Sequence, residues 1–203
     1  MTPTRPELTR RLQEVFAARP TRELDGRGAA VALVVCEKQG SHGVLLTKRA
    51  ARLRSHAGQY ALPGGRLDEG EDAIAAALRE VREEIGLELS AGDVIGRLPD
   101  YRTRSGYRIT PIVVWATDSG DMAPNAAEVE EVFHIPLSSL RGPGVPRLLK
   151  SGESGRPIIQ MPLPHDLLIH APTGAILHQF AEAALAGRYV DAQSFEEPVW
   201  ARR

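Results

Sequence analysis

Apolar residues gather in short runs along the chain, and most runs have the length and composition of β-strands. The clearest is the uninterrupted stretch 29–36, whose valines and alanines predict a central strand buried on both faces. Turn-forming residues flank it at 25–28 and 40–43. Further strands are predicted at 44–48, 94–98, 107–117 and 129–135, and a hairpin at 156–161 and 167–170.

Helical periodicity is strongest at 72–85. Apolar side chains recur there at helical spacing and predict one buried stripe, made of Ile74, Ala77, Leu78, Val81 and Ile85. Asp72 suits the N-cap, and Gly86 suits the position just after the last turn. Both ends of this helix are therefore predicted from single residues.

Two further helices are predicted, at 5–18 and, capped by Thr173, at 173–185. The stretch 138–149 predicts no definite element. Strands and helices do not alternate regularly, so an α+β fold or a mixed α/β sandwich is favoured over a doubly wound sheet. Tyr189, Phe195 and Trp200 predict that the end of the chain packs on other structure.

Length and charge narrow the class of protein. The chain has 203 residues, the size of one domain. Its 25 Lys and Arg against 26 Asp and Glu give a formal net charge of −1, so no overall field attracts nucleic acid or an anionic membrane. The single cysteine, Cys36, excludes an internal disulfide, and no apolar run has the length of a membrane span or a signal-peptide core. We expect a cytoplasmic protein without nucleic-acid or membrane partners.

Three glutamates stand close together in the second half of the 72–85 helix. Glu80, Glu83 and Glu84 lie at i, i+3 and i+4, on a face about 130° from the apolar stripe. Like charges at these spacings repel, and the helix macrodipole disfavours acids near this end. One interpretation is a solvated acidic face. The other is a site for a divalent cation, because magnesium prefers carboxylate oxygens.

The residues around these glutamates follow a fixed spacing. The order is Gly65, five residues, Glu71, seven residues, Arg79-Glu80-Val81, one residue, Glu83-Glu84, one residue and Gly86-Leu87. It matches every fixed position of the pattern G-x5-E-x7-R-E-U-x-E-E-x-G-U, where U is a bulky aliphatic residue. The chain therefore resembles the Nudix hydrolases, which cleave a nucleoside diphosphate linked to another moiety.

The resemblance implies an α+β fold of the Nudix type, an α/β/α sandwich with a mixed sheet between helices and a loop–helix–loop that carries the metal site. We expect this domain at 27–186. A helical extension at 1–26 precedes it, and a tail at 187–203 packs on the domain or on a second subunit.

The resemblance also implies roles for individual residues. Glu80, Glu83 and Glu84 would bind magnesium or manganese, and a backbone carbonyl of Gly64 or Gly65 would add a ligand. Glycines let backbone groups approach a ligand closely, which also places Gly65 among the substrate-binding residues. Arg79 and Glu71 would orient the ligands by pairing with each other.

A further acid, as metal ligand or general base, often comes from a loop beyond the helix in this family. Glu128, Glu130 and Glu131 are available, and the Glu128-Val129 pair favours Glu128. The alternative is that these acids are an exposed, solvated start of the 129–135 strand.

The basic segment, residues 45–65, ends at the glycine turn Pro63-Gly64-Gly65 and resembles the coenzyme A diphosphatase branch of the family. It matches the pattern L-L-T-x-R-(S/A)-x3-R-x3-G-x3-F-P-G-G except that Leu62 replaces phenylalanine. Four cations, Lys48, Arg49, Arg52 and Arg54, could bind phosphate, and His56 could add a hydrogen bond. The alternatives are a solvated basic loop and, at Leu62, a core position that accepts either residue type.

Three functions follow from these patterns. The first is a metal-dependent coenzyme A diphosphatase that releases 4′-phosphopantetheine, or its acyl form, and adenosine 3′,5′-bisphosphate. The second is a Nudix pyrophosphatase for ADP-ribose, NADH or a dinucleoside polyphosphate. The third is a non-catalytic nucleotide-binding module, which the complete set of glutamates disfavours. A small nucleotide is the expected partner, and the resemblance also favours a homodimer.

Overall fold

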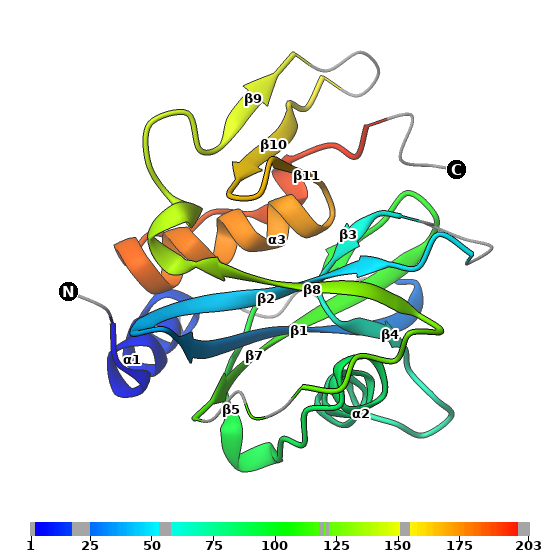
Figure 1. Ribbon diagram of the computed structural model, residues 1–203. Coiled ribbons are helices and arrows are strands. Elements are labelled where there is room, and N and C mark those ends of the chain that lie inside the picture. Colours follow the sequence, from blue (N-terminus) through cyan, green and yellow to red (C-terminus); the bar gives the residue numbers. More distant parts are fainter. Residues whose placement is uncertain are drawn as a thin grey trace.

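The chain folds around a mixed β-sheet with helices on both faces (Figure 1). The computed structural model describes residues 3–17, 25–52, 58–117, 120, 122–150 and 155–198. Within them the main sheet follows the path β3-β2-β1-β7-β5, with β4 beside β1, β6 beside β7 and β8 beside β2. The strands are β1 (Arg27–Lys38), β2 (Ser41–Arg49), β3 (Tyr60–Ala61), β4 (Gly64–Arg66), β5 (Val94–Arg97), β6 (Tyr101–Arg102), β7 (Tyr107–Ala116) and β8 (Val129–Pro136).

The centre of the sheet is the parallel pair β1 and β7, whose register begins with Arg27 opposite Tyr107. Side chains alternate along a strand, so β1 serves two cores. Leu33 faces the core that contains α1 and α3, and Val34 faces the core that contains α2. The apolar run predicted as a central strand therefore has the two-sided burial that its composition indicates.

Helices α1 (Arg5–Phe16) and α3 (Thr173–Phe180) lie on one face, and α2 (Ala73–Ile85) lies on the other (Figure 1). A π-helical turn, η3 (Ala181–Leu185), continues α3. Short 3-10 turns are η1 (Ala91–Asp93), η2 (Leu137–Leu140) and η4 (Ala192–Ser194). This arrangement confirms the predicted sandwich of helices around a mixed sheet. None of the described helices is long and apolar enough to cross a membrane.

A second, smaller sheet lies on the outer side of α3 (Figure 1). It contains β9 (Arg147–Leu149), β10 (Ile158–Leu163) and β11 (Leu167–His170), in the order β11-β10-β9. The predicted hairpin is β10 and β11. Strand β9 comes from a stretch with no predicted element, because all three of its residues are exposed and give no buried alternation.

The predicted buried stripe of α2 needs correction. Ile74 is 36% exposed, whereas Ala76 and Glu84 are buried. The buried face is thus rotated relative to the apolar pattern. The reason is that a helical wheel describes an isolated helix, whereas the sheet and the turn above α2 decide which side is covered.

Other boundaries differ by a residue or two. Thr173 is the first residue of α3 rather than its cap, because the Pro172 carbonyl accepts the first helical hydrogen bond, from the Ile176 N–H at 3.0 Å. Strand β1 begins inside the predicted turn 25–28, since its pairing with β7 extends to Arg27. Near the end of the chain, Phe195 is buried. Trp200 lies outside the described residues.

Candidate metal centre on helix α2

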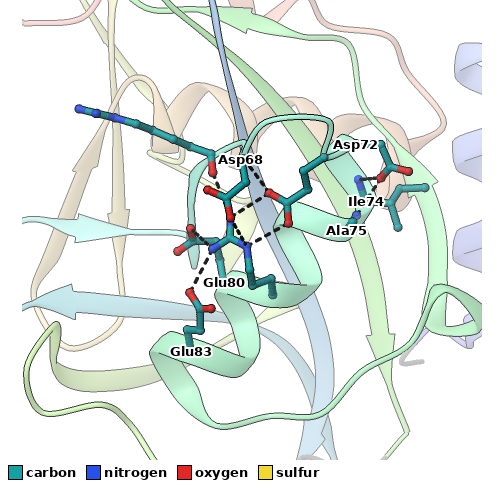
Figure 2. Close-up of polar contacts among 9 residues, drawn as sticks. Asp68, Asp72, Ile74, Ala75, Glu80 and Glu83 are labelled. Carbon is teal, nitrogen blue, oxygen red and sulfur yellow. Dashed lines mark hydrogen bonds and ion pairs between the residues drawn. The ribbon is translucent and has the colours of Figure 1, made fainter.

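Local interactions place α2 and therefore the acids on it. The Asp72 carboxylate accepts hydrogen bonds from the backbone N–H groups of Ile74 and Ala75, both at 2.8 Å (Figure 2). Gly86 ends the helix in the left-handed conformation, and its N–H donates to the Arg82 carbonyl at 3.0 Å. The helix thus has the limits that Asp72 and Gly86 predicted. It packs against the glycine turn of β4.

Arg79 is the centre of a network of acids. Its Nε and Nη2 donate to the two oxygens of Glu71 at 2.9 and 3.0 Å. Its Nη1 donates to Glu80 at 2.8 Å and to Glu83 at 3.0 Å, and Figure 2 shows both carboxylates directed to the same group from α2. Hydrogen bonds from Arg79 hold the pKa of Glu71 below its usual value. The structure therefore brings together four residues of the predicted site.

Glu84 lies apart from this network and is 2% exposed. Its Oε1 lies 3.5 Å from Nη1 of Arg49, and its Oε2 is buried with no hydrogen-bond partner among the described residues. Burial raises the pKa of Glu84 to about 8, even though Arg49 and the Gly64 N–H favour the charged form. The desolvation penalty is thus larger than the attraction of one guanidinium at this distance. The alternative of a uniformly solvated acidic face is wrong at this position.

One of the two glycines of β4 packs against an acid of α2, and the other packs against strand β1. A Cβ atom on Gly65 would overlap the Glu80 carboxylate. A Cβ on Gly64 would lie 2.7 Å from the Cα of Val31, because β4 is hydrogen-bonded to β1 with Val31 opposite Gly64. Both positions therefore require glycine for close approach, one to a carboxylate and the other to backbone.

Comparison with known proteins agrees with this geometry. The NUDIX domain family model matches residues 26–154, which include the sheet centre, the glycine turn and α2. A protein of Photorhabdus laumondii, described as "Uncharacterized Nudix hydrolase NudL", is 37% identical over 163 residues, covering 78% of this chain and 85% of the relative. This chain belongs to the Nudix family.

Two further comparisons show how much of a relative's length this chain matches and which solved structure shares its fold. A relative of the same description from Cronobacter sakazakii is 45% identical over 116 residues. The match covers 57% of this chain and 60% of the length of that relative. A solved structure of a MutT/nudix family protein from Enterococcus faecalis has the same fold, with a TM-score of 0.51 and 17% identity over 76% of this chain and 54% of that chain.

The acids of this Nudix protein fit a divalent cation only in part. Among the described residues, no group of three or more His, Cys, Asp or Glu side chains is arranged to hold a metal ion. Glu80 and Glu83 instead have oxygens bonded to Arg79. A buried, unpartnered oxygen on Glu84 nevertheless fits a hard cation, since burial disfavours its negative charge and a cation would compensate for it. Burial likewise raises the pKa of Glu80.

Of the acids beyond the helix, Glu128 is the one that acts on the Nudix glutamates. Its negative charge contributes to the raised pKa values of both Glu80 and Glu84, after the larger effect of burial. Its carbonyl accepts a hydrogen bond from the Ala50 N–H at 2.8 Å, which ties the loop before β8 to the end of β2. Glu130 instead accepts a hydrogen bond from Lys48 at 2.6 Å.

The basic segment is not a set of free cations. Lys48 is paired with Glu130, and the Arg52 guanidinium donates to the carbonyls of Ala126 and Ala127. Arg49 alone of these three contacts the acidic site, through Glu84. Arg54 and His56 lie outside the described residues. The described cations of this segment therefore connect β2 with β8 and with α2.

Sequence reasoning missed two residues of the turn between β4 and α2. The Arg66 carbonyl accepts a hydrogen bond from Arg79 Nη2 at 3.0 Å, and the Asp68 carboxylate lies 3.7 Å from Arg79 Nε (Figure 2). The Asp68 N–H also donates to Glu71 at 2.9 Å. Their position directly after the two glycines was the available signal. They contact Arg79 from the turn, whereas Glu80 and Glu83 contact it from the helix.

Proposed function

We propose that this Nudix protein hydrolyses the diphosphate bond of a nucleoside diphosphate derivative, with coenzyme A or an acyl-CoA as the first candidate substrate. The observation that carries the proposal is the buried Glu84 carboxylate with an unpartnered oxygen, beside the glycine turn that Glu80 also contacts. A bound magnesium or manganese ion would neutralise the negative charge of the diphosphate and of the leaving oxygen. Glu80, Glu83, Glu84 and the Gly64 carbonyl would hold that ion.

The other residues of the site orient groups and move a proton. Glu71 and Arg79 hold Glu80 and Glu83 in fixed positions through the hydrogen bonds described above. Water adds to one phosphorus as the bond from that phosphorus to the bridging oxygen breaks, and Glu128 takes the proton that the water releases. With coenzyme A the products are 4′-phosphopantetheine and adenosine 3′,5′-bisphosphate.

The choice of coenzyme A rests on the 45–65 segment and on the surroundings of Leu62. Leu62 is 3% exposed and belongs to the core, so leucine in place of phenylalanine is an exchange of core residues and removes no exposed ring. A second candidate is a substrate without a 3′-phosphate, such as ADP-ribose. It is favoured by Lys48 and Arg52, whose charges are engaged within the protein.

A product assay on the full chain with magnesium tests the proposal. Coenzyme A, dephospho-coenzyme A and ADP-ribose are compared by mass analysis of the products, with Glu84→Gln as the blank. We expect adenosine 3′,5′-bisphosphate from coenzyme A at a rate that the variant reduces by orders of magnitude. Faster cleavage of ADP-ribose would replace coenzyme A by the second candidate. Equal rates for the wild type and the variant would refute the role of Glu84.

A further inference from the structure

Two arginines lie over one tyrosine ring at the end of the main sheet. Arg27 and Tyr107 begin the parallel strands β1 and β7 and lie opposite each other, and Arg66 ends β4 opposite Ala29 of β1. The guanidinium carbon of Arg27 lies 4.2 Å from the centroid of the Tyr107 ring, and that of Arg66 lies 5.3 Å from it. We call these three residues the arginine clamp. Three strands distant in sequence are needed to assemble it.

No carboxylate of the described residues balances the charge of the clamp. Arg27 Nη2 donates to the Ser105 carbonyl at 3.1 Å, and no acid among the described residues forms an ion pair with Arg27 or Arg66. Neighbouring Arg108, on the same strand as Tyr107, lies 3.6 Å from Asp100. Two like charges over one ring repel each other, and the ring compensates each of them only weakly at an exposed site. An anion bound to the two guanidinium groups would compensate for their charge.

The clamp begins one residue after the acidic site. Arg66 directly follows Gly65, and its carbonyl accepts a hydrogen bond from Arg79, which holds Glu80 and Glu83. Side chains alternate along a strand, so the Arg66 side chain lies on the face of β4 opposite to the one where Gly65 meets Glu80. The clamp is therefore next to the proposed metal site in the chain but separate from its ligands.

Guanidinium chemistry indicates which ligand the clamp would take. An arginine stacked on an aromatic ring has its orientation restricted and can still donate two parallel hydrogen bonds to a phosphate. Because the guanidinium groups lie over the Tyr107 ring, the clamp offers positive charge to a ligand more than a flat surface for a base. Lys48 and Arg52, which the sequence predicted for phosphate binding, are already engaged within the protein.

We propose that Arg27 and Arg66 bind a phosphate group of the substrate other than the diphosphate that is hydrolysed. This inference rests on the proposed function, because it takes the ligand to be a nucleotide. For coenzyme A the group is the 3′-phosphate, and the clamp then distinguishes coenzyme A from dephospho-coenzyme A.

The test measures binding rather than turnover. Calorimetric titration of the full chain in EDTA compares adenosine 3′,5′-bisphosphate with AMP, which lacks the second phosphate. We expect the bisphosphate to bind at least tenfold more tightly to the wild type. Arg66→Ala and Arg27→Ala should reduce that ratio to near one while the affinity for AMP stays unchanged. Arg66→Lys, which keeps the charge but loses the paired donors, should give an intermediate ratio.

Arg147→Ala is the matched control, since Arg147 is an exposed arginine on β9 of the other sheet. It should leave the ratio at the wild-type value. The proposal is overturned if the wild type binds both ligands equally, if it binds neither, or if the clamp variants weaken both ligands alike. Thermal unfolding checks that each variant is folded. If Arg27→Ala does not fold, the result for Arg66→Ala alone tests the proposal. A tenfold ratio in a protein that hydrolyses no coenzyme A would support the clamp and refute coenzyme A as the substrate.

Discussion

Replacing Glu84 with glutamine should stabilise the metal-free protein, and the gain should increase with pH. Burial raises the pKa of Glu84 from its usual 4.5 to about 8. Between these values the folded protein keeps a proton that the unfolded chain has released. Each pH unit in that window therefore lowers the free energy of unfolding through this group by about 1.4 kcal/mol. By pH 7 the loss is about 3 kcal/mol, a large share of the roughly 5–15 kcal/mol typical of a folded domain.

Glutamine removes the titration but nearly keeps the shape of the side chain. Its carbonyl oxygen can still accept the hydrogen bond from the Gly64 N–H. The variant leaves Arg49 without the carboxylate that lies 3.5 Å from its Nη1, and that loss does not change with pH. The informative quantity is therefore the difference in pH dependence between the two proteins and not the stability at a single pH.

Urea unfolding in EDTA, from about pH 5 to about pH 8, measures this difference. We expect the stability of the wild type to fall with pH relative to Glu84→Gln, with equal m-values. Glu88→Gln is the control, because it removes the carboxylate of an exposed glutamate just after α2 and leaves the buried one in place. Parallel curves for the wild type and Glu84→Gln would refute the reasoning, since they would mean that the folded state compensates the Glu84 charge.

Three further predictions concern the surroundings of the site. Gly64→Ala should destabilise the protein by about 1–3 kcal/mol in thermal unfolding, because the new atom meets backbone, whereas Gly65→Ala should displace only the Glu80 carboxylate and lower turnover at nearly unchanged stability. Arg79→Lys should lower turnover by roughly 10–100-fold, measured as kcat, because lysine cannot hold several carboxylates at once. Lys48→Ala should leave thermal stability and KM nearly unchanged, because its ion pair with Glu130 is partly exposed and engages its charge within the protein.

Much of the fold followed from local pattern. The apolar run at 29–36 predicted the central strand, and Asp72 and Gly86 marked the ends of α2, because capping and alternation depend on residues close in sequence. The small outer sheet did not follow in full. Strand β9 is exposed along its whole length and has no periodicity to detect.

The candidate site was likewise predicted from the sequence only in part. The spacing from Gly65 to Gly86 predicted that Glu71, Arg79 and the glutamates act together, and the structure places Arg79 between them. The spacing did not predict that Glu84 would be buried, because Glu84 lies away from the apolar stripe on a helical wheel. The strand that carries Arg49 and the glycine turn of β4 cover that side of α2.

The sequence by itself determined which elements form and which acids α2 carries, since these properties depend on neighbouring residues. Only the tertiary structure decided which charges are paired and which are not. Lys48 meets Glu130 because β2 lies beside β8, and Arg27 and Arg66 share one ring because β4 and β7 flank β1. Such pairings join residues far apart in the chain, and the register of the sheet sets them.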